Sequence, residues 1–256
     1  MTSESRRNGG RFDLVAANSL AVVNPDYEID FDLTVSVARI TNNGREVPLT
    51  VEVQAGGQGA TQYGWQDKLT LSQSGEVRYP TLFHSLASGA LSRFGSGTEY
   101  HRDKVHVRVL EELPESVRVT VLGEFKRPLA WEDMKDIWNS EVGVFLLSGA
   151  RPSAKPLSWD LNGLDCMARG FNICGPEGAK ITSPSEQFRR WVALLGEEDK
   201  GYLEPFGLTL EELRAAAAKA RIHGLIVTGE PEIVLRFAED YRVKRIDIVS
   251  VIPYES

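Results

Sequence analysis

Residues 222–231, Ile-His-Gly-Leu-Ile-Val-Thr-Gly-Glu-Pro, decide how the rest of the chain is interpreted. The apolar run predicts a short strand, and Pro231 suits the first turn of a helix, where its missing N–H needs no partner. A helix is expected over residues 232–240 and a second strand over residues 245–251. The apolar face of that helix, at a period near 3.6, consists of Ile233, Val234, Phe237 and Tyr241. The end of the chain therefore predicts a strand–helix–strand unit.

The same order of elements occurs about one hundred residues earlier. Residues 116–125 predict a strand, Pro128 turns the chain, residues 130–139 predict a helix, and residues 141–147 predict the next strand. Five aromatic residues fall on the predicted helical faces of the chain and are expected in the core: Trp131, Trp138, Phe188, Trp191 and Phe237.

An insertion over residues 148–220 separates the two units. Its first half, to about residue 181, is rich in Gly, Pro and Ser and predicts a long loop. Its second half predicts two helices, which begin after Ser183 and Thr209, each the first residue of a capping box. The acidic residues 196–201 are expected to form a solvated connector between these helices.

Two β-α-β units around an insertion predict an α+β, ferredoxin-like domain over residues 113–256, in which four strands form one mostly antiparallel sheet. A doubly wound parallel sheet is the alternative, but it requires regular alternation of strands and helices. The sequence before this domain does not show that alternation.

Residues 13–112 predict an antiparallel β-rich region. Strict alternation over residues 27–37 and again over 47–54, with Asn43-Gly44 between them, predicts a β-hairpin. A second hairpin, a short helix and a further strand are expected over residues 68–79, 81–93 and 105–110. Residues 1–12 predict a disordered tail, and residues 14–23 predict a strand or loop because Asp13, Asn18 and Ser19 interrupt the apolar run.

Composition narrows the classes of partner. The chain of 256 residues has a net charge of −7, which argues against a nucleic-acid-binding surface, because such surfaces usually carry a basic excess. No run of 18 apolar residues occurs, so no membrane span is expected in this chain. A protein partner or a small-molecule signal is the expected ligand.

No catalytic, cofactor-binding or metal-binding residues are predicted, because no known catalytic, phosphate-binding or metal-ligand spacing occurs. Tyr63 and Trp65, aromatic residues in a glycine-rich stretch, are the candidate interaction residues. Asp160 and Asp165 could act as an acid–base pair, although turns commonly contain Asp for conformational reasons. Cys166 and Cys174 are either buried thiols or a small disulfide loop.

Several passages resemble the C-terminal domain family of sigma-factor regulators. The first is Leu113-Pro114-Glu115-Ser116 with a strand that ends in Phe125-Lys126-Arg127-Pro128-Leu129. The later Phe188-x-x-Trp191, the helix over residues 210–220 and the closing passage from His223 are also similar to that family. The resemblance covers residues 113–256.

The resemblance implies the outer, non-enzymatic part of a membrane-anchored anti-sigma protein, with an extracytoplasmic location and a role in transcription regulation through signal or partner binding. The family's anchoring helix and sigma-binding segment are not in this sequence, so they are expected upstream of Met1 if the resemblance holds. Two alternatives stay open. The chain could be a soluble, cytoplasmic enzyme with its active site near residues 160–174, or a soluble binding protein that acts through its N-terminal hairpins.

Overall fold

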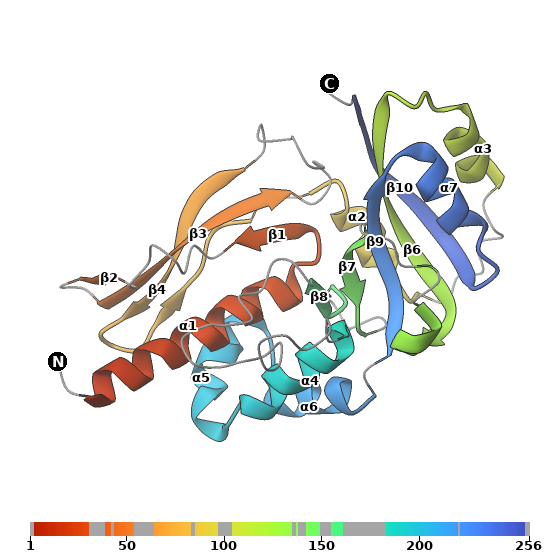
Figure 1. The fold of residues 1–256 in the computed structure, drawn as a ribbon. Helices are drawn as coiled ribbons and strands as arrows, with labels where there is room; N and C mark the ends of the chain where they lie inside the picture. The colour runs from red at the N-terminus through yellow and green to blue at the C-terminus, as the bar shows by residue number, and fades with distance from the viewer. Residues whose placement is uncertain are drawn as a thin grey trace, which may run out of the picture.

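The structure is a computed structural model that describes residues 3–30, 39–41, 44–53, 64–82, 85–96, 104–134, 137, 142–148, 155–160, 183–219 and 221–253. Within these ranges the chain is a mixed α+β protein with two antiparallel sheets (Figure 1). A helix at the N-terminus lies along one face of the first sheet, and a group of helices packs on the side of this helix that faces away from the sheet. The α+β class predicted from the sequence is confirmed.

The N-terminal sheet contains β1 (Tyr27–Asp30), β2 (Arg39–Thr41), β3 (Gly44–Val53), β4 (Trp65–Ser72) and β5 (Val77–Arg78). The strand order is β1-β3-β4-β5, with β2 paired to β3, and every pairing is antiparallel. The predicted alternation holds in β1, where Tyr27 and Ile29 are buried and their neighbours are exposed. The antiparallel pairing of the two predicted hairpin arms is therefore confirmed for residues 27–30 and 44–53, whereas residues 31–38 lie outside the described ranges.

The C-terminal sheet contains β6 (Val117–Leu129), β7 (Val142–Leu146), β8 (Ser158–Asp160), β9 (Ile222–Gly229) and β10 (Val243–Pro253). Its strand order is β10-β6-β9-β7-β8, with antiparallel neighbours throughout. The strand that follows the helix at the C-terminus thus pairs with β6, the first strand of the earlier unit. The two units share one sheet, as the sequence predicts.

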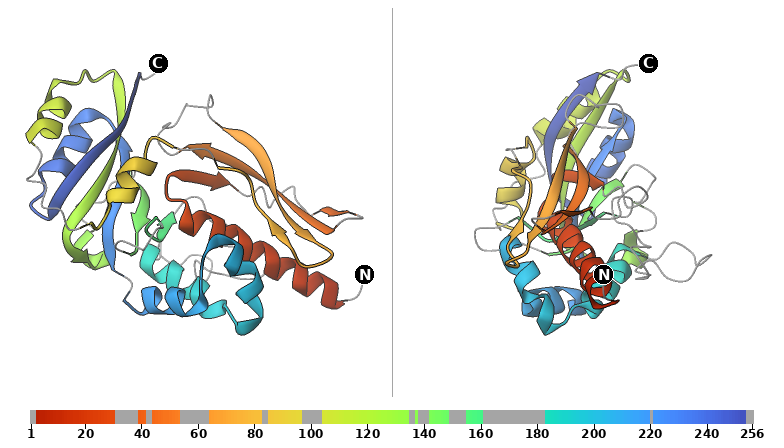
Figure 2. Two further views of the ribbon diagram at one scale, coloured as in Figure 1. Left: turned by 180° about the vertical axis from the view of Figure 1, so that it is seen from behind. Right: turned by 90° about the vertical axis from the view of Figure 1, so that its left-hand side faces the viewer.

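Seven α-helices are present in the described ranges: α1 (Ser3–Val23), α2 (Ser88–Arg93), α3 (Lys104–Glu112), α4 (Pro184–Leu194), α5 (Lys200–Leu203), α6 (Leu210–Lys219) and α7 (Pro231–Glu239). The predicted starts of α4 and α6 are confirmed, because the hydroxyls of Ser183 and Thr209 each accept a bond from the backbone N–H three residues later, at 3.1 Å. Helix α7 covers one face of the C-terminal sheet together with α3, and α2 lies on the opposite face (Figure 2). None of these helices is both long enough and apolar enough to cross a membrane.

The prediction for the N-terminal residues is wrong. The sequence predicts a disordered tail to residue 12 and a strand or loop over residues 14–23. The structure instead has a single helix, α1, which begins at Ser3 and continues to Val23. Residues 12–20 of α1 are all buried. The polar residues that suggested a break are satisfied inside the helix: Asn18 donates to the carbonyl of Leu14 at 2.7 Å, and Ser19 donates to that of Val15 at 2.6 Å.

The predicted strand over residues 105–110 is also wrong, since these residues form α3. The alternating valines suggested a strand, but His106, Leu110 and Leu113 also recur at helical spacing. In α3 Leu110 is buried, and Val105 and Val109 face solvent. The packing of α3 on α7 selects the helix.

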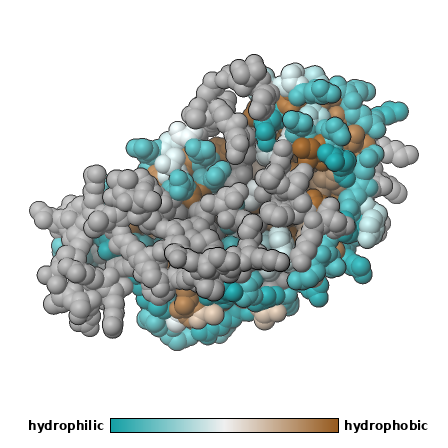
Figure 3. Space-filling view, viewed as in Figure 1, coloured by the Kyte–Doolittle hydropathy of each residue, from teal (hydrophilic) through white to brown (hydrophobic). Residues whose placement is uncertain are grey.

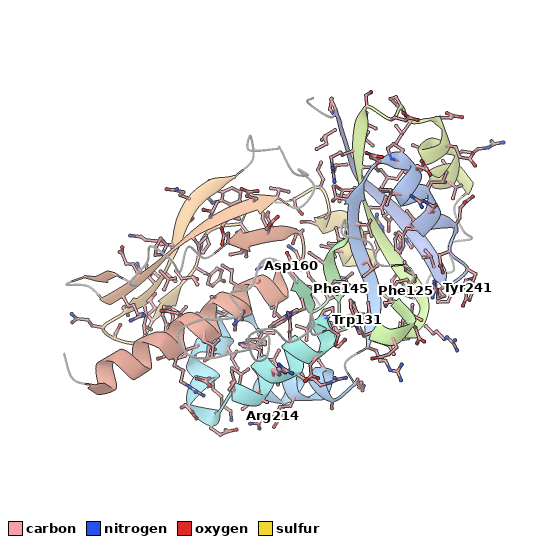
Figure 4. All side chains as sticks on the ribbon, viewed as in Figure 1. Phe125, Trp131, Phe145, Asp160, Arg214 and Tyr241 are labelled. Carbon is pink, nitrogen blue, oxygen red and sulfur yellow. The ribbon has the colours of Figure 1, made fainter. Side chains whose placement is uncertain are left out.

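The helix predicted over residues 130–139 is replaced by a 3₁₀ turn at Trp131–Met134, with residues 135, 136 and 138–140 outside the described ranges. The carboxylate of Asp133 accepts a bond from the N–H of Ala130, which tightens the turn. Tyr241, expected on the apolar face of the last helix, is instead 72% exposed because α7 ends at Glu239. Phe188, Trp191 and Phe237 are buried as predicted, and Trp131 packs edge-on against Phe145 at 5.8 Å (Figure 4).

Two predictions for the insertion need correction. The predicted loop contains β8, which pairs with β7. The acidic connector is not wholly solvated, because Asp199 is fully buried and binds Arg11 of α1 through both carboxylate oxygens, at 2.7 and 2.6 Å. One continuous apolar core links α1, both sheets and the helices of the insertion.

Candidate functional site

The turn between α1 and β1 places a fully buried carboxylate, that of Asp26, between the two sheets. The Lys155 ammonium lies 2.5 and 2.7 Å from its two oxygens. Ser88 donates to the same carboxylate at 3.1 Å, and Ser85 also donates to it. These four residues and Tyr27 are called the Asp26 junction.

The Asp26 junction joins three separate parts of the chain. Asp26 lies directly before β1 of the N-terminal sheet, and Lys155 lies before β8 of the C-terminal sheet. The two serines lie at the start of α2. A buried carboxylate is stable as an ion only when it is paired and hydrogen-bonded, and Asp26 has both kinds of partner.

Tyr27 is the aromatic residue of this junction. The Lys155 ammonium lies 5.5 Å from the centre of its ring, and Trp65 of β4 packs edge-on against it with ring centres 6.2 Å apart. Burial, followed by the charge of Asp26, raises the pKa of Tyr27 to about 12. The contacts of the ring with Lys155 and Trp65 make Tyr27 a packing residue of the junction.

A small hollow lies beside this ring. Its lining includes Pro25, Tyr27, Ser158 and Asp160, and its volume is about 10 Å³. That volume is close to the minimum that one water molecule needs. The hollow is thus too small for a substrate.

Acidic side chains collect on the exposed side of β1. Glu28 and Glu52 are direct neighbours across the strand pair. Partial burial, followed by the charges of Asp160, Glu52 and Asp30, raises the pKa of Glu28. Like charges that face each other across a sheet are destabilising, so this strip of β1 and β3 is electrostatically strained.

An open hollow of about 560 Å³ lies on the N-terminal sheet. The residues that line it come from the outer face of this sheet and from the end of β5 onward. They include Glu46, Lys68, Thr70, Ser72, Arg78 and Tyr79. Small-molecule sites typically have this volume but a more apolar lining. Lys68 pairs with Glu46 at 2.7 Å, so part of the charge is already compensated within the protein.

The structure describes only some of the candidate functional residues that were selected from the sequence. Trp65 is half-buried in β4 beside Tyr27, and Asp160 ends β8 and lines the small hollow (Figure 4). Tyr63, Asp165, Cys166 and Cys174 lie outside the described residues. Trp65 and Asp160, which come from two different predictions, thus each lie near Tyr27: Trp65 packs against its ring, and Asp160 lines the same hollow as Tyr27.

The Asp26 junction itself was missed, because its members are far apart in the sequence. Asp26 lies 59 residues from Ser85 and 129 residues from Lys155. A serine nucleophile activated by lysine would need a neutral amine beside the hydroxyl to accept its proton, whereas the Lys155 side chain binds the Asp26 carboxylate. The contacts of the Asp26 carboxylate are therefore those of a structural ion pair that connects three parts of the chain.

No group of three possible ligands for a metal ion occurs among the residues that the structure describes. His106 contacts the carbonyl of Ile246 through Nδ1 at 2.8 Å, and burial lowers the pKa of His223. Both histidines are consistent with packing roles. On the face shown in Figure 3, the described surface is mainly hydrophilic, and its hydrophobic residues form separate patches.

Comparison of the chain with protein-family models, with curated proteins and with solved structures finds no match.

Proposed function

We propose that this chain is a non-enzymatic sensor or interaction domain, similar to the outer part of a membrane-anchored anti-sigma protein. We also propose that its C-terminal sheet is ferredoxin-like. In this role the chain regulates transcription by binding a protein partner or a small-molecule signal.

The observation that carries the proposal is the order of four strands, β10-β6-β9-β7, with antiparallel neighbours. Two β-α-β units that share one sheet have this strand order. In the first unit of this chain a 3₁₀ turn, followed by residues mostly outside the described ranges, takes the place of the helix. The same residues carry the resemblance to the sigma-factor regulators, from Leu113 to the end of the chain. What supports an interaction role is the open hollow on the N-terminal sheet, next to which Tyr79 is half exposed.

The enzyme alternative places its active site near residues 160–174, of which only residue 160 lies within the described ranges. Within those ranges the hollow beside Asp160 accommodates about one water molecule, and the carboxylate that binds Lys155, that of Asp26, is fully buried. The hairpin-binding alternative agrees better with the structure, because the open hollow lies on the N-terminal hairpins. We therefore place the proposed interaction on that sheet within the same sensor role.

A chimaera tests the sensor role. The outer domain of a membrane-anchored anti-sigma protein is replaced by this chain, and transcription from a promoter that depends on the matching sigma factor is measured. We expect the chimaera to keep transcription low, and Thr70→Arg, which places a longer, charged side chain in the open hollow, to change the transcription level. Arg236→Ala, at an exposed ion pair on α7, is the matched control. Equal transcription from the chimaera, both variants and a chimaera that carries an unrelated folded domain would refute the role.

A further inference from the structure

Helix α2 rests on an apolar cluster that is separate from the main core. Its own contribution is Ala87, Ala90, Leu91 and Phe94, at the i, i+3, i+4 and i+7 positions of one helical face. The sheet contributes Leu122, Val144, Leu146 and Ile226. These four side chains project from the face of the C-terminal sheet that is opposite α7, so they do not belong to the core under α7.

A glycine in β9, Gly224, lies directly under the Phe94 ring. A Cβ atom added at Gly224 would lie 2.7 Å from the Phe94 ring and 2.2 Å from the carbonyl oxygen of Gly123. Real Cβ atoms do not approach other atoms this closely. A glycine at this position of β9 thus makes room for the aromatic ring.

Polar contacts attach α2 at both ends. At the first end, Ser85 and Ser88 donate to the Asp26 carboxylate. At the second end, Arg93 pairs with Asp247 at 3.2 Å, and the carbonyl of Arg93 accepts a bond from Arg245 at 3.4 Å. The Arg93 side chain is about half exposed, so this second attachment is accessible to solvent.

The helix itself is only six residues long. Isolated helices shorter than about 12–15 residues are marginal in water, because nucleation is costly. The helical form of α2 therefore depends on the cluster and on the two end attachments. If α2 leaves the sheet, it unfolds, which is a recurrent way of switching a segment.

We propose that α2 is a reversible strap that covers an apolar docking face on the C-terminal sheet. With the strap open, that face binds an amphipathic helix of a partner protein whose chemistry matches α2. The apolar residues of that helix recur at i, i+3, i+4 and i+7, with an aromatic ring at the last position for the space above Gly224. A basic residue at its C-terminal end pairs with Asp247. The partner class rests on the proposed interaction role, whereas the strap motion stands without it.

Hydrogen exchange tests the motion. In the variant Ser85→Ala/Ser88→Ala/Arg93→Ala the Asp26–Lys155 pair is retained, while the end attachments made by these side chains are lost. We expect the backbone N–H groups of Leu91 and Phe94 to exchange at least about tenfold faster than in the wild type, since bonds to charged groups are among the stronger ones. Exchange in β6 and β9 should accelerate by no more than the loss of global stability that urea unfolding measures, and should stay much slower than exchange in α2. Glu232→Ala/Arg236→Ala, which removes an exposed ion pair on α7, is the control and should change neither region.

The strap is refuted if the α2 amides of the wild type and of the variant exchange only as slowly as those of β6 and β9, because α2 would then open only by global unfolding. If the triple variant does not fold, Arg93→Ala alone applies the same test, since its side chain lies at the surface. A fluorescent peptide of residues 85–96 tests the docking face. It should bind the loosened variant at least about tenfold more tightly than the wild type, and equal binding refutes the docking face. Neither result depends on the chimaera, so failure of the strap and failure of the sensor role are distinguishable.

Discussion

Replacing Lys155 by methionine tests whether the Asp26 junction is a buried ionic tie. Met keeps most of the apolar stem of the lysine but removes the charge, so the Asp26 carboxylate stays fully buried with only the two serine donors. Removing one partner of a buried ion pair typically costs about 3–5 kcal/mol. The lysine side chain is 27% exposed and water therefore reaches the pair, so we expect a loss near the lower limit, about 3 kcal/mol.

Urea unfolding followed by circular dichroism measures this loss as a shift of the midpoint at constant slope. Lys68→Met, at the exposed pair with Glu46, is the matched control and should cost at most about 1 kcal/mol. Asp26→Asn/Lys155→Met should recover at least half of the loss, because asparagine still accepts the serine bonds but carries no charge. Equal stabilities for Lys155→Met and Lys68→Met would show that Asp26 is not held as a buried carboxylate ion.

Four further outcomes are expected. Glu28→Gln should raise the free energy of unfolding at pH 7 by about 0.5 kcal/mol. A raised folded-state pKa penalises the ionised form, so the gain should vanish in unfolding curves measured below the ordinary glutamate pKa, about 4.3. Ultraviolet titration should include a phenol with a pKa of about 12, and Tyr27→Phe should remove that step. Gly123→Ala should cost about 1–3 kcal/mol in urea unfolding, because the new Cβ would lie 2.4 Å from the Phe237 ring. Gly201→Ala in α5, with no atom within 4 Å of the new Cβ, should instead stabilise by about 0.5–1 kcal/mol.

The elements whose signals are local could be predicted from the sequence. The strand–helix–strand passage that ends in β10 was predicted correctly, because Pro231 fixes the start of the helix and the apolar periods on either side are unambiguous. The start of α4 was likewise correct, since Ser183 caps it within four residues. Such signals depend on neighbours in the sequence and on little else.

The elements that depend on distant partners were not predicted. The valine alternation at residues 105–109 fits a strand until α7 is available to pack against, and only then does the helical spacing of His106 and Leu110 decide the structure. The site shows the same limit. Trp65 was singled out from its own surroundings, but nothing near Asp26 in the sequence points to Lys155, its ion-pair partner.

Helix α1 shows why distant charges matter to this fold. Its buried residues cover nearly all of its circumference, so apolar contacts alone would tolerate rotation or sliding of the helix. Charged pairs remove that freedom: Asp13 binds Arg45 of the N-terminal sheet at 2.8 and 2.5 Å, and Arg11 binds Asp199 of the insertion. Each is a bidentate pair with strict geometry, so a shift of one residue would leave a carboxylate buried without its partner. Asp13, one of the polar residues that made α1 look like a loop, is therefore also one of the two residues that set the position of α1, together with Arg11.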